Sequence, residues 1–458
     1  MKRRIGILAL ALPALVTLFM RPAAAAPLSR PFDPVVLKGS VVPKLKGIAP
    51  GLLVAFRYSG GWVQIPVQVD ERKIVSFGQI YNNTAGFTYT GTIKAYADAA
   101  TWTGADSNPN IDNNDEIAFM AKDAGTVAPA GAEPAGVVHG SGEQVKVKDP
   151  LVTGAKGFVY LFRQTGSLDP AAGANYVSYN FNLLSGNYKT TYNIADGPNP
   201  ENSSVSSGRY AVGFGDRWLS DQLSVTVGGS TGVDVLDRRK ALFAPGQCVR
   251  SEDTFNDAEG AFIVNKDGPV RALRAYVGAN SGPYTQRTHR FYQGREDVVT
   301  DLRVHTIPSV MDFFDYSPAA SGMTYANSLN PSGVTVDGDP IQDNLASGFA
   351  VWERVSGQQG GLAIAHSLNT NLSITPSHYY LDDTTPPVAQ CTGDAFAYAQ
   401  SGPHINQSIT CTDPSQGCTN TLKSTRTVYY EEPTLTSAQA AARYNQATNP
   451  VTSTVTSW

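Results

Sequence analysis

The stretch RTHRFYQGREDVVTDLRVH, residues 287–305, decides the fold that we expect for this chain. It holds two of the six histidines and four arginines, although only 16% of the chain is charged. Aromatic and β-branched residues, which are typical of strands, run along both halves and are interrupted at Gly294. We therefore predict a β-hairpin in which THRFYQ turns near Gly294 and returns as VVTDLRVH.

Three further segments, on both sides of this stretch, have the same hairpin pattern. They are GLLVAFRYSGGWVQIPVQVDER around Gly60–Gly61, GAFIVNKDGPVRALRAYVGA around Asp267–Gly268, and SGFAVWERVSGQQGGLAIAHSL near Gly360–Gly361. Only TSAQAAARYNQA near the C-terminus predicts a helix, with Ser437 as its N-cap. The prediction is an all-β fold: a large antiparallel β-sandwich or supersandwich with long loops and little helix.

Changes in amino-acid composition along the chain predict five segments. Residues 1–26 form a signal peptide, with basic Lys2–Arg4, an apolar core and small residues at the cleavage site. An N-terminal β segment follows over 27–125, and an Ala/Pro/Gly-rich loop or linker over 126–145. The main β-supersandwich is expected over 146–385, and a C-terminal extension stapled by disulfides over 386–458.

The ends, the cysteines and the charge predict where the protein works. The signal peptide implies a secreted or periplasmic protein, and no later apolar run is long enough to span a membrane. An even count of four cysteines outside the cytoplasm favours disulfides, and we pair Cys411 with Cys418 and Cys248 with Cys391, although three pairings remain open. A net charge of -4 and a pI near 5.9 argue against nucleic acid as a partner.

Three motifs resemble a pattern of secreted bacterial proteins of glycan-use systems. VQIPVQVDER (63–72) and IDNNDEIAFMAKDAG (111–125) are similar to their "IPxQxDD" and "DGxxDELxF" strands, and DGPVRALRAYVG (267–278) is similar to their "GPxR" central strand. Those proteins resemble the galactose-mutarotase-like β-supersandwich that several polysaccharide lyases use. The resemblance therefore implies that fold and a polysaccharide or cell-surface glycan as partner. The long insert between Asp70 and Asp112 departs from the pattern.

The opening stretch offers candidate groups for lyase chemistry. A polysaccharide lyase needs a group that neutralises the sugar carboxylate, a base for the C5 proton and an acid for the leaving oxygen. His289 and His305 are candidate catalytic residues if the hairpin brings them to adjoining strands, and Tyr292 is a candidate acid. Alternation places His289 and Tyr292 on opposite faces unless a bulge intervenes. The alternative is a solvated polar face of the sheet.

The stretch DRRKALFAPGQCVRSEDTF, residues 237–255, offers a second set of candidates. Arg239 and Arg250, together with Arg290 of the hairpin, are candidate substrate-binding residues because the guanidinium fork binds a uronate carboxylate bidentately. Glu252 is a candidate catalytic acid or base, and Tyr325 a candidate sugar contact. Ion pairing that holds a loop beside a disulfide is the alternative.

The acidic stretch ADSNPNIDNNDE, residues 105–116, predicts Ca²⁺ as a cofactor. Asp106, Asp112, Asp115 and Glu116 supply oxygens at near-alternate spacing, which calcium prefers. The EF-hand pattern fails, because Ile111 and Ile117 stand where it needs Gly and Glu. An Asn-rich turn built from Asx-turns is the alternative.

The leading functional hypothesis is an exported carbohydrate-active protein, in particular a polysaccharide lyase acting on an acidic glycan. The alternative is a non-catalytic glycan-binding or cell-envelope structural protein. The sequence contains no Gly-x-Ser-x-Gly elbow, no His-Glu-x-x-His and no P-loop, which argues against serine-hydrolase, zinc-protease and NTPase chemistry.

Overall fold

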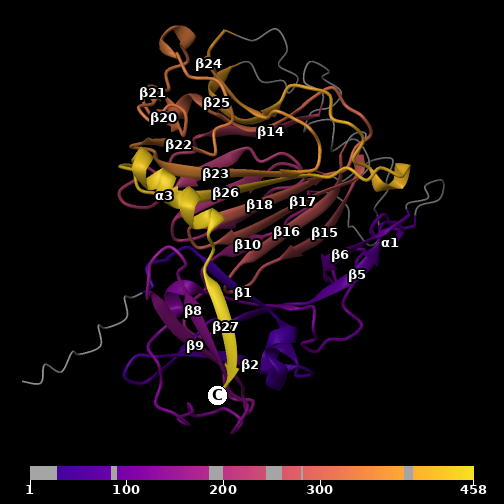
Figure 1. Cartoon of the computed structure of the whole chain (residues 1–458), viewed down its shortest axis with the longest axis vertical. Helices are drawn as coiled ribbons and strands as arrows, with labels where there is room; N and C mark the ends of the chain where they lie inside the picture. Colours follow the sequence, from indigo (N-terminus) through magenta and orange to yellow (C-terminus); the bar gives the residue numbers. More distant parts are fainter. Residues whose placement is uncertain (1–27, 84–89, 185–199, 244–259, 280–281, 386–395) are drawn as a thin grey trace, which may run out of the picture.

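The computed structural model describes residues 28–83, 90–184, 200–243, 260–279, 282–385 and 396–458. An antiparallel sheet of nine strands crosses the middle of the molecule (Figure 1). The all-β prediction is confirmed. In spatial order the strands are β15 (Ala261–Lys266), β16 (Ala272–Ala279), β17 (Gly282–Tyr292), β18 (Arg295–Leu302), β26 (Leu422–Glu431), β23 (Gly360–Thr370), β22 (Trp352–Gly357), β20 (Thr324–Asn327) and β21 (Val334–Thr335).

The hairpin predicted over 287–305 is confirmed. β17 and β18 pair antiparallel, with His289 opposite Val298 and Tyr292 opposite Arg295, so the turn falls at Gln293–Gly294. A Cβ atom on Gly294 would lie 2.5 Å from Cδ1 of Phe32, which explains why glycine occupies the turn. The hairpins predicted around Gly60, Asp267 and Gly360 also form, as β2 with β3, β15 with β16 and β22 with β23.

Two four-stranded sheets pack on one face of the nine-stranded sheet, which we call its inner face. Their main core joins Tyr210 and Phe314 to Phe291, Ile364 and Val428 of the nine-stranded sheet. The first of these sheets has the order β14 (Leu236–Phe243), β19 (Val310–Tyr316), β25 (Ala397–Ile405) and β24 (Ser377–Asp383). The second has the order β10 (Ser178–Asn180), β11 (Ser203–Ser206), β12 (Tyr210–Phe214) and β13 (Gln222–Val225).

A smaller β unit lies at one end of the long axis, coloured indigo to magenta in Figure 1. Its hydrophobic core includes Val35, Ile117, Val145 and Leu161. Its five-stranded sheet has the order β27 (Thr452–Ser457), β8 (Glu143–Lys148), β9 (Lys156–Arg163), β2 (Leu53–Tyr58) and β3 (Trp62–Ile65). Its smaller sheets are β1 (Pro34–Lys38), β7 (Glu116–Met120) and β4 (Gln68–Asp70), and β5 (Arg72–Ser76) with β6 (Thr92–Tyr96).

The predicted C-terminal helix forms as α3 (Ser437–Thr448) and packs against β22 and β23. Its N-cap is Thr436 and not Ser437, because the Thr436 side chain closes a capping box with Gln439. A one-turn helix, α1 (Phe77–Ile80), was not predicted. Among the described residues, no helix is both long and apolar enough to cross a bilayer.

The structure differs from the expected segment boundaries at both ends. The residues after 395 are not a separate extension, because β25 and β26 lie inside the sandwich sheets and β27 pairs with β8 of the smaller unit. The smaller unit also extends past residue 125, since β8 and β9 belong to its sheet. The disulfide Cys411–Cys418 is confirmed. The signal peptide up to Ala26, and the cysteines Cys248 and Cys391, lie outside the described residues.

Candidate functional site

The inner face of the nine-stranded sheet carries a band of charged side chains that faces the sheet of β14, β19, β25 and β24. Alternation along the strands directs them inward, because neighbours in each strand point to the opposite face. The band is buried, with each residue at most 3% exposed, and consists of Arg287 and His289 on β17, Glu296 on β18, Arg426 on β26 and His366 on β23. His289, a predicted catalytic residue, and the charged residues beside it are therefore enclosed between two sheets, and this face is not the solvated polar face that was the alternative.

Glu296 has three hydrogen-bond partners, which are Arg239, Tyr430 and His289. Nη1 and Nη2 of Arg239 each donate to one of its oxygens at 2.7 Å, and the Tyr430 hydroxyl donates at 3.0 Å. Burial by itself would raise the pKa of Glu296, but Arg239 and His289 outweigh burial and hold the pKa below its ordinary value. Since Arg239 lies on β14, the pair links the two sheets. Both Nη groups of Arg239, which was predicted to bind substrate, are thus engaged by a protein carboxylate.

His289 is held by both of its ring nitrogens. Nδ1 lies 2.8 Å from Oε1 of Glu296, and Nε2 lies 3.1 Å from the Tyr276 hydroxyl. Burial lowers the pKa of His289 to about 3, so the ring is neutral at pH 7. The network assigns the proton to Nδ1, which donates to Glu296, while Nε2 accepts from Tyr276. In this arrangement His289 has no lone pair available for a substrate proton.

The other proposed catalytic residues do not join His289. Tyr292 lies on the opposite face of β17, where it packs with Ala118 and Val270. His305 lies three residues beyond the end of β18, and the four positions from Val298 to Leu302 alone span about 13 Å at ~3.3 Å per residue. The prediction that the hairpin brings His289 and His305 together is therefore wrong. Glu252 lies outside the described residues.

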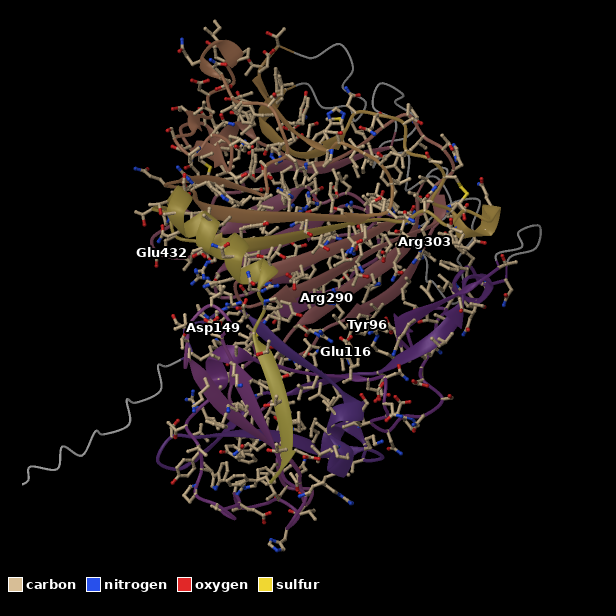
Figure 2. The ribbon with its side chains drawn as sticks, viewed as in Figure 1. Tyr96, Glu116, Asp149, Arg290, Arg303 and Glu432 are labelled. Atoms are coloured by element: carbon tan, nitrogen blue, oxygen red, sulfur yellow. A yellow bond between two sulfur atoms is a disulfide. The ribbon has the colours of Figure 1, made fainter. Side chains whose placement is uncertain are left out.

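The remaining substrate-binding candidates are separated in the same way. Arg290 faces the smaller β unit, and its Nε donates to the Tyr96 hydroxyl at 3.1 Å. Tyr96 in turn donates to Glu116 at 2.8 Å, and Figure 2 labels all three at the boundary between the two parts of the molecule. Tyr325 is completely buried, and its ring lies 4.4 Å from that of Tyr380. Arg250 lies outside the described residues.

The motif residues that carried the resemblance mostly join the two parts of the molecule. Oε1 of Gln68 accepts from the backbone nitrogens of Val270 and Arg271. The Arg271 guanidinium binds Asp70 at 2.7 Å and Glu116 at 2.8 Å. Burial would raise the pKa of Asp70, but Arg271 and Lys266 lower it to about 2. These residues therefore form a buried polar junction between β4, β7 and the start of β16.

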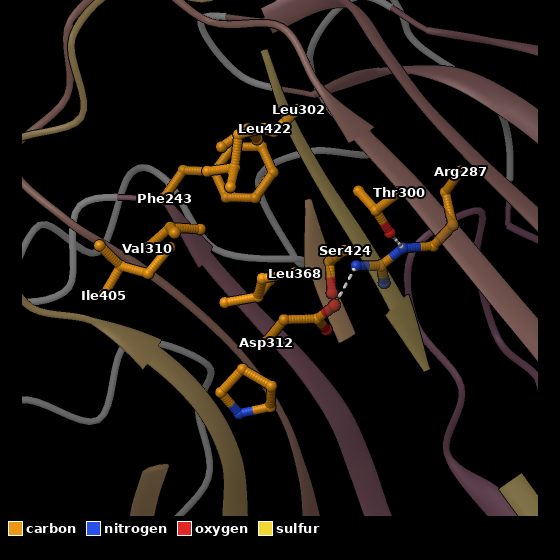
Figure 3. A pocket seen from close by; sticks show the side chains of 11 residues that line it. Phe243, Arg287, Thr300, Leu302, Val310, Asp312, Leu368, Ile405, Leu422 and Ser424 are labelled. Atoms are coloured by element: carbon orange, nitrogen blue, oxygen red, sulfur yellow. Dashed lines mark hydrogen bonds and ion pairs between the residues drawn. The ribbon is translucent and has the colours of Figure 1, made fainter. Parts of the chain in front are cut away.

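A pocket opens between the two sheets next to the charged band (Figure 3). Its space for water-sized molecules is about 40 Å³, enough for a few waters or for a carboxylate group. Arg287, Thr300, Asp312 and Ser424 lie along one side, but their polar atoms form almost none of the accessible wall, which is apolar. The apolar wall consists of Phe243, Leu302, Val310, Leu368, Pro403, Ile405 and Leu422.

Asp312 of the pocket wall binds two arginines, Arg287 of the same wall and Arg426, which is not one of the lining residues. Nη2 of Arg287 lies 2.8 Å from Asp312, and Nη2 of Arg426 lies 3.3 Å from the other oxygen of Asp312. Nε and Nη1 of Arg426 are buried and have no hydrogen-bond partner among the described residues. Burial, together with Arg287 and Arg239, lowers the pKa of Arg426. This corner of the interior has one more cation than anion.

The acidic stretch predicted to bind calcium is only partly brought together. Asp106 and Asp115 meet Glu71, with one oxygen of each within 4.8 Å of the others. Oδ1 of Asp112 instead accepts from the Asn114 backbone nitrogen at 2.8 Å, and Glu116 binds Arg72 and Arg271. Of the predicted ligands Asp106, Asp112, Asp115 and Glu116, the structure groups Asp106 and Asp115 with Glu71 and does not place Asp112 and Glu116 in that group.

Glu71 is the residue that the sequence argument missed at this cluster. Both of its carboxylate oxygens are buried and have no hydrogen-bond partner among the described residues. Burial, with Asp115 and Asp106 beside it, raises the pKa of Glu71 to about 7. Glu71 follows Asp70 in the "IPVQVDER" motif, and the pairing of Asp70 with Glu116 brings the two motifs side by side.

A second group of metal-ligand residues was also missed. Glu353, His366 and His378 each place one ligand atom within 4.8 Å of the others. The predicted hairpin near Gly360 could have indicated that Glu353 and His366 lie close together. Its register sets Glu353 opposite Ile364, and His366 follows two residues later on the same face of the sheet.

Comparison with known proteins gives only distant structural matches. No protein-family model matches the sequence, and no curated protein is similar enough to match. An alpha-mannosidase from Enterococcus faecalis V583 matches with 8% identity and a TM-score of 0.44, over 94% of this chain and 45% of the mannosidase. This chain thus spans less than half the length of that protein.

Galactose mutarotase-like proteins are among the other matches. One from Clostridium acetobutylicum has 10% identity and a TM-score of 0.32, over 51% of this chain and 96% of its own. A putative aldose 1-epimerase from Escherichia coli K12 has 11% identity and a TM-score of 0.28, over 56% of this chain and 99% of its own. At these values the function has to be inferred from the residues of this chain.

Proposed function

We propose that this chain is an exported glycan-binding protein that holds an acidic sugar at the pocket beside Arg287 and Asp312, without lyase chemistry at His289. One observation supports the proposal: Arg287 and Asp312 line the pocket, and Arg426, which lies behind the wall, shares Asp312 with Arg287. Two buried N–H groups of Arg426 have no hydrogen-bond partner among the described residues. A buried cation without full compensation favours an anionic ligand.

The chemistry of the pocket fits a sugar acid. An arginine binds a carboxylate with strong charge-assisted hydrogen bonds. The pocket has room for that group, and the C–H groups of the ring would lie against its apolar wall, which includes Leu368 and Val310. A side-chain rotation that exposes the Ser424 hydroxyl would add a hydrogen bond to the sugar, whereas the Thr300 hydroxyl already accepts from Nε of Arg287. Apolar walls with a few convergent polar groups are the usual anatomy of a ligand site.

The geometry favours binding over elimination because the proposed base is inaccessible. His289 is 2% exposed and donates to Glu296 while it accepts from Tyr276. A base must lie within hydrogen-bond reach of the proton that it removes, and no described residue of the pocket wall is a histidine or a tyrosine.

A pair of variants on one strand tests the proposal. Ser424→Phe fills the pocket, whereas Thr425→Phe places the same ring on the opposite face of β26. Binding of uronate and neutral oligosaccharides is measured by isothermal titration calorimetry, with circular dichroism to confirm that both variants are folded. We expect the wild type and Thr425→Phe to bind uronate oligosaccharides and Ser424→Phe to lose at least about tenfold in affinity, or 1.4 kcal/mol. Equal affinity of all three, or no uronate binding by the wild type, would overturn the proposal.

We also propose Ca²⁺ as a structural ion of the smaller β unit, held by Glu71, Asp106 and Asp115. Hard carboxylate oxygens are the ligands that calcium prefers, and three acidic groups so close together repel one another without a cation. The unpartnered oxygens of Glu71 support the proposal. Its test is the last prediction of the Discussion.

A further inference from the structure

The group formed by Glu353, His366 and His378 lies where the two large sheets face each other. Glu353 is on β22 and His366 on β23 of the nine-stranded sheet, whereas His378 is on β24 of the four-stranded sheet. Nε2 of His366 lies 2.9 Å from Oε1 of Glu353, and Nε2 of His378 lies 2.9 Å from Oε2. The three side chains are at most 2% exposed.

The charge of Glu353 is compensated differently from that of the other buried carboxylates nearby. Glu296 binds Arg239, and Asp312 binds two arginines. Glu353 is completely buried, and its ion-pair partners among the described residues are the two histidines alone. A carboxylate taken out of water without a fixed cation is strongly disfavoured, so a bound cation would stabilise Glu353 further than the two histidines do.

The donor atoms match the ligands of a divalent transition metal. Two imidazole Nε2 atoms and one carboxylate form a three-residue set that zinc sites use. Around a tetrahedral zinc ion the ligand atoms are about 3.4 Å apart, and the three ligand atoms here lie within 4.8 Å of one another, so small side-chain rotations would bring them to that spacing. Imidazole ligands disfavour Ca²⁺, which sets this group apart from the all-oxygen cluster at Glu71.

The chain supplies three ligand atoms at this place, and a water would complete a tetrahedral set. Nδ1 of His366 and Nδ1 of His378 are buried and have no hydrogen-bond partner among the described residues. The contacts at Nε2 are therefore what orient both rings.

We infer that Glu353, His366 and His378 bind a Zn²⁺ ion that clips the four-stranded sheet to the nine-stranded sheet. The ion serves the fold, because its ligands are enclosed and come from both layers. Metal binding at such a site is coupled to folding, since the unfolded chain does not preassemble the three ligands. The inference is independent of the glycan pocket, which lies against other residues of the same interface.

The experiment uses the full chain, expressed without a histidine tag, for elemental analysis. We expect about one zinc ion per chain in the wild type. Glu353→Gln and His378→Gln remove one ligand each and are expected to lose the zinc. The matched control is His404→Gln on neighbouring β25, since His404 is a partly buried histidine outside the ligand set. His404→Gln should keep the zinc and its Tm. Zinc retained in full by Glu353→Gln and His378→Gln would overturn the inference.

A second measurement on the wild type decides the matter if those variants do not fold. The protein is unfolded with chelator and refolded with Zn²⁺, Co²⁺ or Ca²⁺. At pH 8 we expect Zn²⁺ or Co²⁺ to raise the Tm further when Ca²⁺ already saturates the Glu71 cluster, and Co²⁺ to show the visible bands of a four-coordinate ion, which Ca²⁺ cannot produce. A wild type that holds no zinc, shows no such cobalt spectrum and gains no stability from either metal would contradict the inference.

Discussion

Arg239 and Glu296 form a two-pronged ion pair across the sandwich, with both nitrogen–oxygen distances at 2.7 Å and both side chains at most 2% exposed. The pair joins β14 of one sheet to β18 of the other. The charged stretch that dominates the sequence is therefore part of the interior, where it orders the contact between two layers.

Removing one partner of this pair should destabilise the fold. In Arg239→Met, Glu296 stays buried with only His289 and Tyr430 as partners. We expect the free energy of unfolding, measured in urea, to fall by about 3–5 kcal/mol, the usual effect of leaving a buried charge uncompensated.

An exposed pair provides the control for that measurement. Lys423 and Asp301 lie 3.9 Å apart with side chains 47% and 33% exposed. Lys423→Ala should change the free energy of unfolding by less than about 1 kcal/mol, because solvent screens this pair. Equal effects of Arg239→Met and Lys423→Ala would contradict the role assigned to the buried pair.

The neutral state of His289 makes stability depend on pH in the mildly acidic range. Burial lowers its pKa from 6.5 to about 3, so the stabilisation is fully present above pH 6.5 and is lost as the pH falls towards 3. His289→Gln should be less stable than the wild type at pH 7. Between pH 6.5 and 4.5 the wild type should lose about 2–3 kcal/mol more than the variant, at 1.36 kcal/mol per pH unit. Parallel curves of unfolding free energy against pH for the two proteins would refute this.

Asp70, at the junction between the two parts of the molecule, should make stability depend on pH in a more acidic range than His289 does. Arg271 and Lys266 outweigh burial and lower its pKa from 3.8 to about 2. Its stabilisation is thus present above pH 3.8 and lost as the pH falls through 2. Asp70→Asn should be less stable than the wild type by about 2 kcal/mol at pH 7, and the difference should vanish near pH 2. Chemical denaturation at several pH values checks this, and a difference that persists at pH 2 would point to another cause.

The hairpins could be predicted because their signals are local. Gly294 and Gly360 stand at turns, and aromatic and β-branched residues fill the strands on either side. What sequence could not show is which layer covers which face. Alternation correctly placed His289 and Tyr292 on opposite faces of the strand. The sequence could not show that β14 and β19 pack on the inner face, and this packing buries His289 and lowers its pKa, so that the ring cannot act as a base.

The missed residues depend on pairings between distant strands. His378 reaches Glu353 because β24 pairs with β25, which in turn pairs with β19, and none of these contacts has a local signal. Glu71 reaches Asp115 because β4 pairs with β7 across a long insert. The predicted ligands all came from the single stretch of residues 105–116, and Glu71 lies outside that stretch.

The acidic cluster at Glu71 gives the last prediction, that calcium stabilises this protein more at alkaline than at acidic pH. Burial and the neighbouring Asp115 and Asp106 raise the pKa of Glu71 from 4.5 to about 7. Without an ion, the contribution of Glu71 to stability is thus present below pH 4.5 and is lost as the pH rises through 7. Because Ca²⁺ competes with that proton, millimolar Ca²⁺ should raise the Tm at pH 8 and have little effect at pH 5.

Glu71→Gln should abolish the calcium effect, whereas Asp112→Asn, whose oxygen still accepts from Asn114, should keep it. A Tm that does not respond to calcium at pH 8, or responds equally in Glu71→Gln, would rule out this site.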